Sequence, residues 1–153
     1  MMKGRHHYEA RTEWTEGKRM RLVVRGKLDL EVCTPPEFGG PEGFLSPEDL
    51  FVASACTCYM TTFFAVADGA RLDYEGFNCR AEGTVEKLEG EGFRFTKIDL
   101  YPELTIGGDE EEEWASRVLE MSRKNCLVTN SMACHVVVNP TIHVEGKQPN
   151  PRC

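Results

Sequence analysis

The chain has 153 residues, with 25 acidic and 18 basic side chains and a formal net charge of −7. This length predicts one domain, residues 1–153, that buries a hydrophobic core of its own. The acidic balance argues against a nucleic-acid partner, because phosphate binding needs a basic face. The first residues, MMKGRHHYEARTEW, contain no apolar signal-peptide segment, so we expect a cytoplasmic protein.

The N-terminal segment, residues 5–33, predicts antiparallel strands with one solvent-exposed face. Leu28, Leu30 and Val32 occupy every second position, which is the period of a strand. The glycine and lysine just before them predict a tight hairpin turn. Residues 34–45 are rich in proline and glycine and predict a loop that leads to the longest apolar stretch of the chain.

Residues 46–68 predict a long helix that is apolar on every face. Ser46 is a favourable N-cap, Glu48 and Asp49 suit the positive end of the helix dipole, and Gly69 is a natural stop. A helix apolar all round is buried, and the serine and threonines within this one favour a core helix over a membrane span. One small sheet and one amphipathic helix cannot cover it, so a second subunit is expected.

The rest of the chain predicts further strands and a second helix. Residues 72–106 indicate two strands around a glycine-rich turn, 109–126 a helix that begins with an acidic run, and 135–146 a last strand broken at Pro140. Strands, helix, strands, helix and strand in this order predict an α+β fold with antiparallel sheets, since a parallel fold alternates strands and helices.

Cysteines are the most informative side chains for function. Seven of them in a chain without a secretion signal favour reduced thiols with a redox or metal role over a disulfide scaffold. Cys56 and Cys58 lie roughly 200° apart around the helix axis, so only one of them can face a given pocket. Helical metal pairs need a spacing of three or four, and Cys134 and His135 face opposite sides of a strand. We therefore expect no bound metal.

The spacing of the thiols leaves open which of Cys56 and Cys58 is functional, and where its partner lies. Cys33, Cys79 and Cys153 are interpreted as buried packing residues or as exposed thiols. A cysteine hydrolase remains an alternative, although the histidines lie in no recognisable catalytic motif and no GxSxG sequence occurs.

Three stretches of the chain carry a resemblance to a known family, and they occur in the same order as in that family: LDLEVCTPPEFGGPEG at 28–43, SPEDLFVASACTCYMTTF at 46–63 and CLVTNSM at 126–132. Together they resemble the OsmC/Ohr family of thiol-dependent peroxidases. The resemblance implies an OsmC-like fold, with antiparallel sheets wrapped around a long central helix and a second helix. It also implies an intertwined homodimer.

The resemblance implies that Cys58 is the attacking thiol and Cys126 the resolving one, with Cys56 as a packing residue or spare thiol. Cys58 would reduce an organic hydroperoxide to an alcohol and become a sulfenic acid, which Cys126 would condense to a disulfide. An external dithiol of the lipoyl type would reduce the disulfide, and no bound cofactor is implied. The role of Cys134, eight residues after Cys126, stays open.

Burial in an apolar helix raises the pKa of a thiol, and a nearby cation opposes this effect. By resemblance, the cation is an arginine of the N-terminal hairpin, held by a glutamate at the helix start, here Glu48. An ungapped count places the arginine position on Gly17. A shift of two residues makes Arg19 the candidate, with Lys18 and Arg21 close by.

The third stretch lacks the proline that follows the cysteine in the best-characterised hydroperoxide reductases, so the reaction class carries over better than the substrate. Phe51, Met60, Phe63 and Phe64 predict apolar surroundings that favour lipid-like or aryl hydroperoxides over hydrogen peroxide. The alternative is a non-enzymatic dimeric protein that binds an apolar ligand or senses redox state.

Overall fold

The computed structural model describes residues 4–146, so Cys153 lies outside the described residues. Within this range the chain forms two units that divide between Phe51 and Val52. The long helix α1 (Pro47–Ala70) runs across the division.

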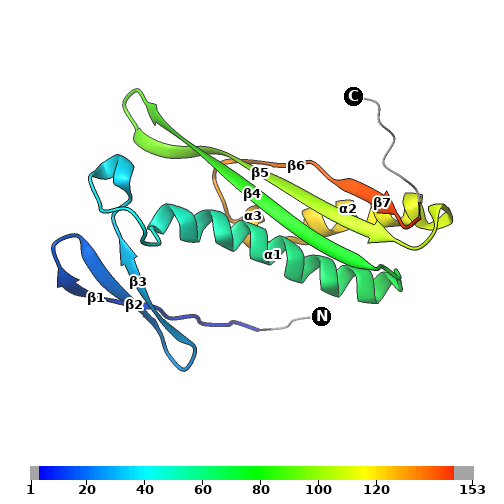
Figure 1. Cartoon of the computed structure of the whole chain (residues 1–153), viewed down its shortest axis with the longest axis horizontal. Helices are drawn as coiled ribbons and strands as arrows, with labels where there is room; N and C mark the ends of the chain where they lie inside the picture. Colours follow the sequence, from blue (N-terminus) through cyan, green and yellow to red (C-terminus); the bar gives the residue numbers. More distant parts are fainter. Residues whose placement is uncertain (1–3, 147–153) are drawn as a thin grey trace. The chain divides into compact units, whose positions relative to one another are not determined.

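The first unit is built on a three-stranded antiparallel sheet in the order β1-β2-β3, drawn in blue in Figure 1. Its strands are β1 (Arg11–Glu16), β2 (Arg19–Val24) and β3 (Leu28–Cys33). Lys27 closes the second hairpin by donating its backbone N–H to the carbonyl of Val24 at 3.0 Å. A 3-10 helix, η1 (Pro36–Phe38), lies in the loop that follows the sheet. The antiparallel pairing of these three strands agrees with the prediction from the sequence.

Local signals determine where α1 starts and stops. Asp49 donates its backbone N–H to the hydroxyl oxygen of Ser46 at 3.1 Å, and the Asp49 carboxylate accepts the backbone N–H of Ser46 at 2.9 Å. The sequence predicted a helix over 46–68 with Gly69 as its stop, but the helix continues to Ala70. It ends there in a Schellman motif, in which Arg71 has φ +52° and the N–H of Leu72 reaches the carbonyl of Ala67 at 3.0 Å.

The second unit contains a sheet that combines antiparallel and parallel pairing. Strands β4 (Gly76–Leu88) and β5 (Gly92–Ile106) form a long antiparallel hairpin. Strands β6 (His135–Val138) and β7 (Thr141–Val144) each pair with β5 in the parallel direction. The α+β class and the antiparallel hairpins are confirmed. The sequence did not predict the parallel pairs, which arise because a helical crossover returns the chain to the end of the sheet where β5 begins.

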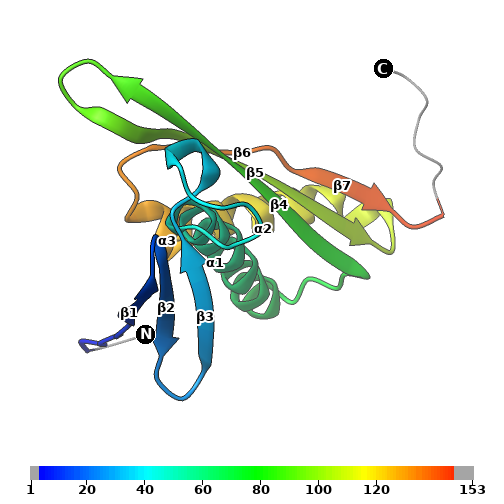
Figure 2. The same ribbon diagram turned by 60° about the vertical axis from the view of Figure 1, so that its left-hand side comes forward.

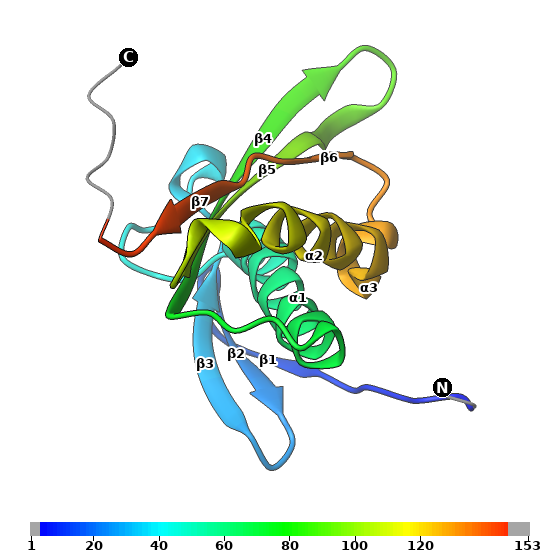
Figure 3. The ribbon, with the colours of Figure 1, turned by 90° about the vertical axis from the view of Figure 1, so that its right-hand side faces the viewer.

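That crossover is η2 (Asp109–Glu111) and α2 (Glu112–Asn125), followed after Cys126 by the single turn α3 (Leu127–Asn130). Figures 2 and 3 show α1 and α2 side by side on one face of the sheet. Their shared core contains eight buried side chains: Phe63, Ala67, Leu72, Leu104, Ile106, Ala115, Val118 and Leu119. This packing holds the C-terminal end of α2 beside the middle of α1.

Helix α1 is apolar on every face, yet in one chain it buries a single stripe. The buried positions are Ala55, Tyr59, Phe63 and Ala67, spaced four residues apart. Phe64, on another face, keeps 41% of its surface exposed. Among residues 4–146, α1 is the helix long and apolar enough to cross a membrane by length and composition, and 22% of its most apolar window is buried. The sheet and α2 thus cover one side of α1 only, which agrees with the prediction that one chain cannot cover this helix. The second subunit stays a prediction.

Candidate thiol site

Cys56 and Cys58 point to different surroundings, as their spacing on the helix predicted. The thiol of Cys56 donates to the backbone carbonyl of Cys79 in β4 at 3.2 Å. The sulfur of Cys58 instead accepts the backbone N–H of Val128 in α3 at 3.5 Å. The two thiols therefore belong to two separate sites.

Cys126 lies beside Cys58, at the junction between α2 and α3. Its backbone is extended, with φ −70° and ψ 103°, which turns the chain between the two helices and leaves the side chain fully buried. Burial raises the pKa of the Cys126 thiol, hydrogen bonds with Thr129 oppose this shift, and the nearby thiol of Cys58 adds to it. The structure thus brings together the two thiols that the family resemblance singled out.

Two polar groups contact the sulfur of Cys58 directly. The hydroxyl of Thr62 lies 4.0 Å from it but donates its proton to the Cys58 carbonyl at 2.8 Å, so its oxygen is available to accept the thiol proton. The amide of Val128 is a donor, and a hydrogen bond from a donor favours negative charge on the acceptor. Sequence reasoning missed Val128, because a backbone amide leaves no side-chain signature.

One of the apolar residues expected around Cys58 is instead part of the hydrophobic core. Phe63 is fully buried and stacks on Phe77, with ring centres 3.9 Å apart. Phe64 packs edge-on to Phe63, with centres 6.3 Å apart, and stays partly exposed. Phe63 therefore stabilises the fold, and the predicted role of Phe64 in an apolar site stays a prediction.

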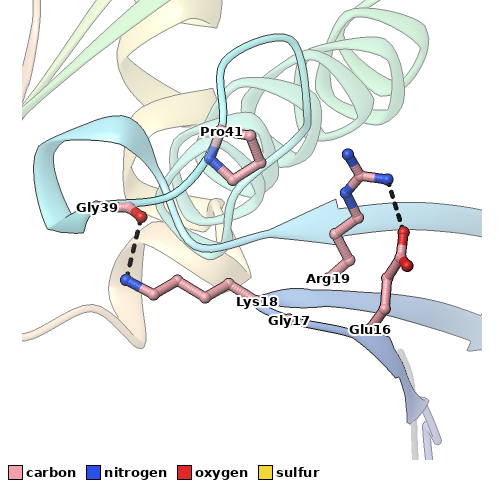
Figure 4. A pocket seen from close by; sticks show the side chains of 6 residues that line it. All are labelled: Glu16, Gly17, Lys18, Arg19, Gly39 and Pro41. Carbon is pink, nitrogen blue, oxygen red and sulfur yellow. Dashed lines mark hydrogen bonds and ion pairs between the residues drawn. The ribbon is translucent and has the colours of Figure 1, made fainter.

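The basic candidates Lys18 and Arg19 lie in the first unit, at a hollow of about 370 Å³. The hollow is lined by Glu16, Gly17, Lys18, Arg19, Gly39 and Pro41. Figure 4 shows the two cations reaching in different directions. Lys18 donates to the carbonyl of Gly39 at 3.1 Å, and Arg19 pairs with Glu16 at 3.1 Å. The Arg19 guanidinium also lies 4.7 Å from the centre of the Phe44 ring.

The other members of the expected activating group are Arg21 and Glu48. Arg21 forms an ion pair with Glu13 across the β1-β2 hairpin, so its guanidinium already has a partner within the sheet. Within residues 4–146, the Oε2 atom of Glu48 is buried and lacks a hydrogen-bond partner. A buried carboxylate oxygen without a donor is costly, so this atom marks a place that a donor would stabilise. The pairing of Arg19 with Glu48 stays a prediction.

The remaining described cysteines differ in their surroundings. Cys33 is buried and donates to the carbonyl of Lys18 at 3.0 Å, which fits its expected packing role. Cys134 is a half-buried free thiol. Cys79 was expected to be a packing or exposed residue, and it is half-buried; its thiol donates to the carbonyl of Arg80 at 3.8 Å, and its own carbonyl accepts the thiol of Cys56 at 3.2 Å. Desolvation and this contact with Cys56 raise the pKa of Cys79 to about 12.

The part of the chain that the structure describes contains no group of three or more metal-ligating side chains.

Comparisons with known proteins agree with this architecture. Residues 39–141 match the family model described as OsmC-like protein. The uncharacterized protein YmaD of Bacillus subtilis is 22% identical over 135 residues, which cover 86% of this chain and 89% of that protein.

Two solved structures share the fold. An OsmC-like protein of unknown function from Vibrio cholerae has a TM-score of 0.80 and 20% identity, with 89% of this chain and 99% of that chain covered. An organic hydroperoxide resistance protein OsmC from Legionella pneumophila has a TM-score of 0.75 and 22% identity, with 93% and 100% covered. Since the family model spans well over half of the sequence, the chain belongs to the OsmC-like family.

Proposed function

We propose that the protein is a thiol-dependent peroxidase that reduces organic hydroperoxides to alcohols. The observation that carries the proposal is the hydrogen bond that the backbone N–H of Val128 donates to the sulfur of Cys58 at 3.5 Å, because Val128 lies two residues after the buried Cys126. Membership of the OsmC-like family supports a redox role, and the similar Legionella pneumophila protein is named an organic hydroperoxide resistance protein.

The reaction divides into three balanced steps. The thiolate of Cys58 attacks the outer oxygen of the hydroperoxide, the O–O bond breaks, and the alkoxide leaves and takes a proton to become the alcohol. Cys58 is now a sulfenic acid, which the thiol of Cys126 converts to a disulfide with release of water. An external dithiol then reduces the disulfide by exchange and becomes a disulfide itself.

The roles of the surrounding groups follow from their chemistry. The Val128 amide stabilises negative charge on Cys58 before the attack. Burial keeps Cys126 protonated until the sulfenic acid forms beside it. Its raised pKa fits the resolving thiol rather than the thiol that attacks the hydroperoxide. Arg19 is proposed as the activating cation, held by the unpaired oxygen of Glu48. A second copy of the chain is proposed to cover the exposed faces of α1.

One equivalent of cumene hydroperoxide, followed by peptide mass spectrometry of the full chain, tests the proposal. We expect a disulfide between Cys58 and Cys126 and one equivalent of alcohol. Unmodified thiols with intact hydroperoxide would contradict the enzyme and support a protein that binds an apolar ligand. Turnover with a lipoyl dithiol then compares substrates, and equal rates for cumene hydroperoxide and hydrogen peroxide would contradict apolar selectivity.

A further inference from the structure

A second pair of thiols lies on the side of α1 that faces β4. Cys56 donates its thiol to the backbone carbonyl of Cys79 at 3.2 Å, so its sulfur lies against the residue that carries the second thiol. The Cys79 thiol donates to the carbonyl of Arg80 at 3.8 Å. Both residues are half-buried and free. One thiol belongs to the middle of a helix and the other to a strand, so a bond between them would link two elements of the second unit.

We propose that Cys56 and Cys79 form a second redox-active dithiol, which closes into a disulfide between α1 and β4 on exposure to a small-molecule disulfide. This pair is distinct from the proposed peroxidase pair, because the sulfur of Cys58 contacts the amide of Val128 instead, although Cys126 also adds to the raised pKa of Cys79. The proposal therefore stands whether or not the protein reduces hydroperoxides.

The chemistry is two successive exchange steps. Cys56 loses its proton and attacks one sulfur of the small disulfide, whose S–S bond breaks and whose other half leaves as a thiolate. Cys79 then loses its proton and attacks the Cys56 sulfur of the mixed disulfide, and the second half leaves as a thiolate. The protein loses two hydrogens, and the small disulfide is reduced to two thiols.

The surroundings of the pair set the order and speed of these steps. Burial raises the pKa of Cys79 to about 12, so little of this thiol is ionised near neutral pH. We therefore assign the first attack to Cys56. Cys79 acts second, when its neighbour already carries the leaving group and the reaction is intramolecular.

Trypsin provides a direct test, because Cys79 is the sole cysteine of the peptide between Arg71 and Arg80. The full chain is incubated with oxidised glutathione, blocked and digested. We expect the peptide 72–80 to be linked to the peptide 28–71, which contains Cys33, Cys56 and Cys58, with a mass two hydrogens below the sum. Matched variants identify the partner: C58S keeps the link and C56S abolishes it.

Three results would overturn the proposal. In the first, the peptide 72–80 is recovered as a free thiol while the glutathione disulfide is consumed elsewhere. In the second, this peptide of the parent chain carries glutathione and no cross-link. In the third, it is linked to the peptide 125–147. Urea unfolding of C58S gives a second readout. The oxidised form should unfold at higher urea than the reduced form, and this difference should vanish when C56S is added.

Discussion

The backbone amide of Val128 lies 3.5 Å from the sulfur of Cys58, although the two residues are 70 positions apart. The contact depends on Cys126, whose extended backbone ends α2 and starts the short turn that presents the amide. A turn of four residues is thus held at the sulfur by the packing of α2 on α1.

Removal of this amide is predicted to slow the reactions of Cys58. V128P deletes the N–H, and proline is tolerated in a first helical turn, where the amide has no helical acceptor. A hydrogen bond to a charged group contributes about 1.5–3 kcal/mol, so peroxide reduction and Cys58 alkylation should each slow by roughly tenfold or more. Alkylation at Cys58 is followed by mass spectrometry.

Two matched variants separate the amide from the effects of substitution. V128A keeps the N–H and removes most of the side chain. L127P places proline one position earlier, where Cys126 already has the extended backbone that precedes proline, and Leu127 is 64% exposed. Both should react at close to the parent rate. Equal slowing in V128A would assign the effect to packing and contradict a role for the amide.

The two helix cysteines should differ in a single assay. C58S is predicted to abolish peroxide consumption, because a serine hydroxyl at this position does not attack the O–O bond. C56S is predicted to keep most of the activity, because its side chain faces β4. Consumption of cumene hydroperoxide with a dithiol reductant measures both. Loss of activity in C56S together with its retention in C58S would show that the attacking thiol was assigned to the wrong residue.

Local chemistry explains which features the sequence predicted. The N-terminus of α1 depends on the contact between Ser46 and Asp49, three residues apart, so the pattern was readable. The helix end was missed because Arg71, not a glycine, adopts the left-handed backbone. The Cys58–Cys126 pair came from the family resemblance, since spacing cannot reveal a partner on another helix. The contact between Cys56 and Cys79 was missed because it depends on how β4 packs against α1.

Tyr59 joins the two main helices of the second unit through its hydroxyl group. The side chain is fully buried, and the hydroxyl donates to the carbonyl of Leu119 in α2 at 3.0 Å. Y59F is predicted to lower the free energy of unfolding by about 1 kcal/mol, the usual contribution of such a bond. T57A removes an exposed hydroxyl from the same helix and should change stability by less than about 0.5 kcal/mol. Equal urea midpoints for Y59F and the parent chain would contradict the link.

Alkaline pH should destabilise the fold partly through Cys79. The pKa of this thiol is about 12 in the folded chain and about 9 when unfolded. Below pH 9 both states keep the proton, and between pH 9 and 12 the unfolded state loses it first, so stability falls as pH rises. C79A, under reducing conditions, should show a shallower fall over this range. Burial also shifts the pKa of Tyr59 upward, and Cys79 adds to that shift, so C79A reduces the Tyr59 contribution in the same direction. Parallel stability curves would contradict the assignment.

Two glycines of β4 should respond differently to the same substitution. A Cβ at Gly83 would lie 2.6 Å from Cγ2 of Val52 on α1 and 2.7 Å from Cε1 of Phe95 on β5, so one of these elements must move. G83A is therefore predicted to destabilise the chain by about 1–3 kcal/mol in urea unfolding. At Gly76 the nearest atom, in Thr105, is 3.9 Å away, an ordinary contact. G76A should be nearly neutral, and equal losses in the two variants would show that β4 does not approach α1 closely at Gly83.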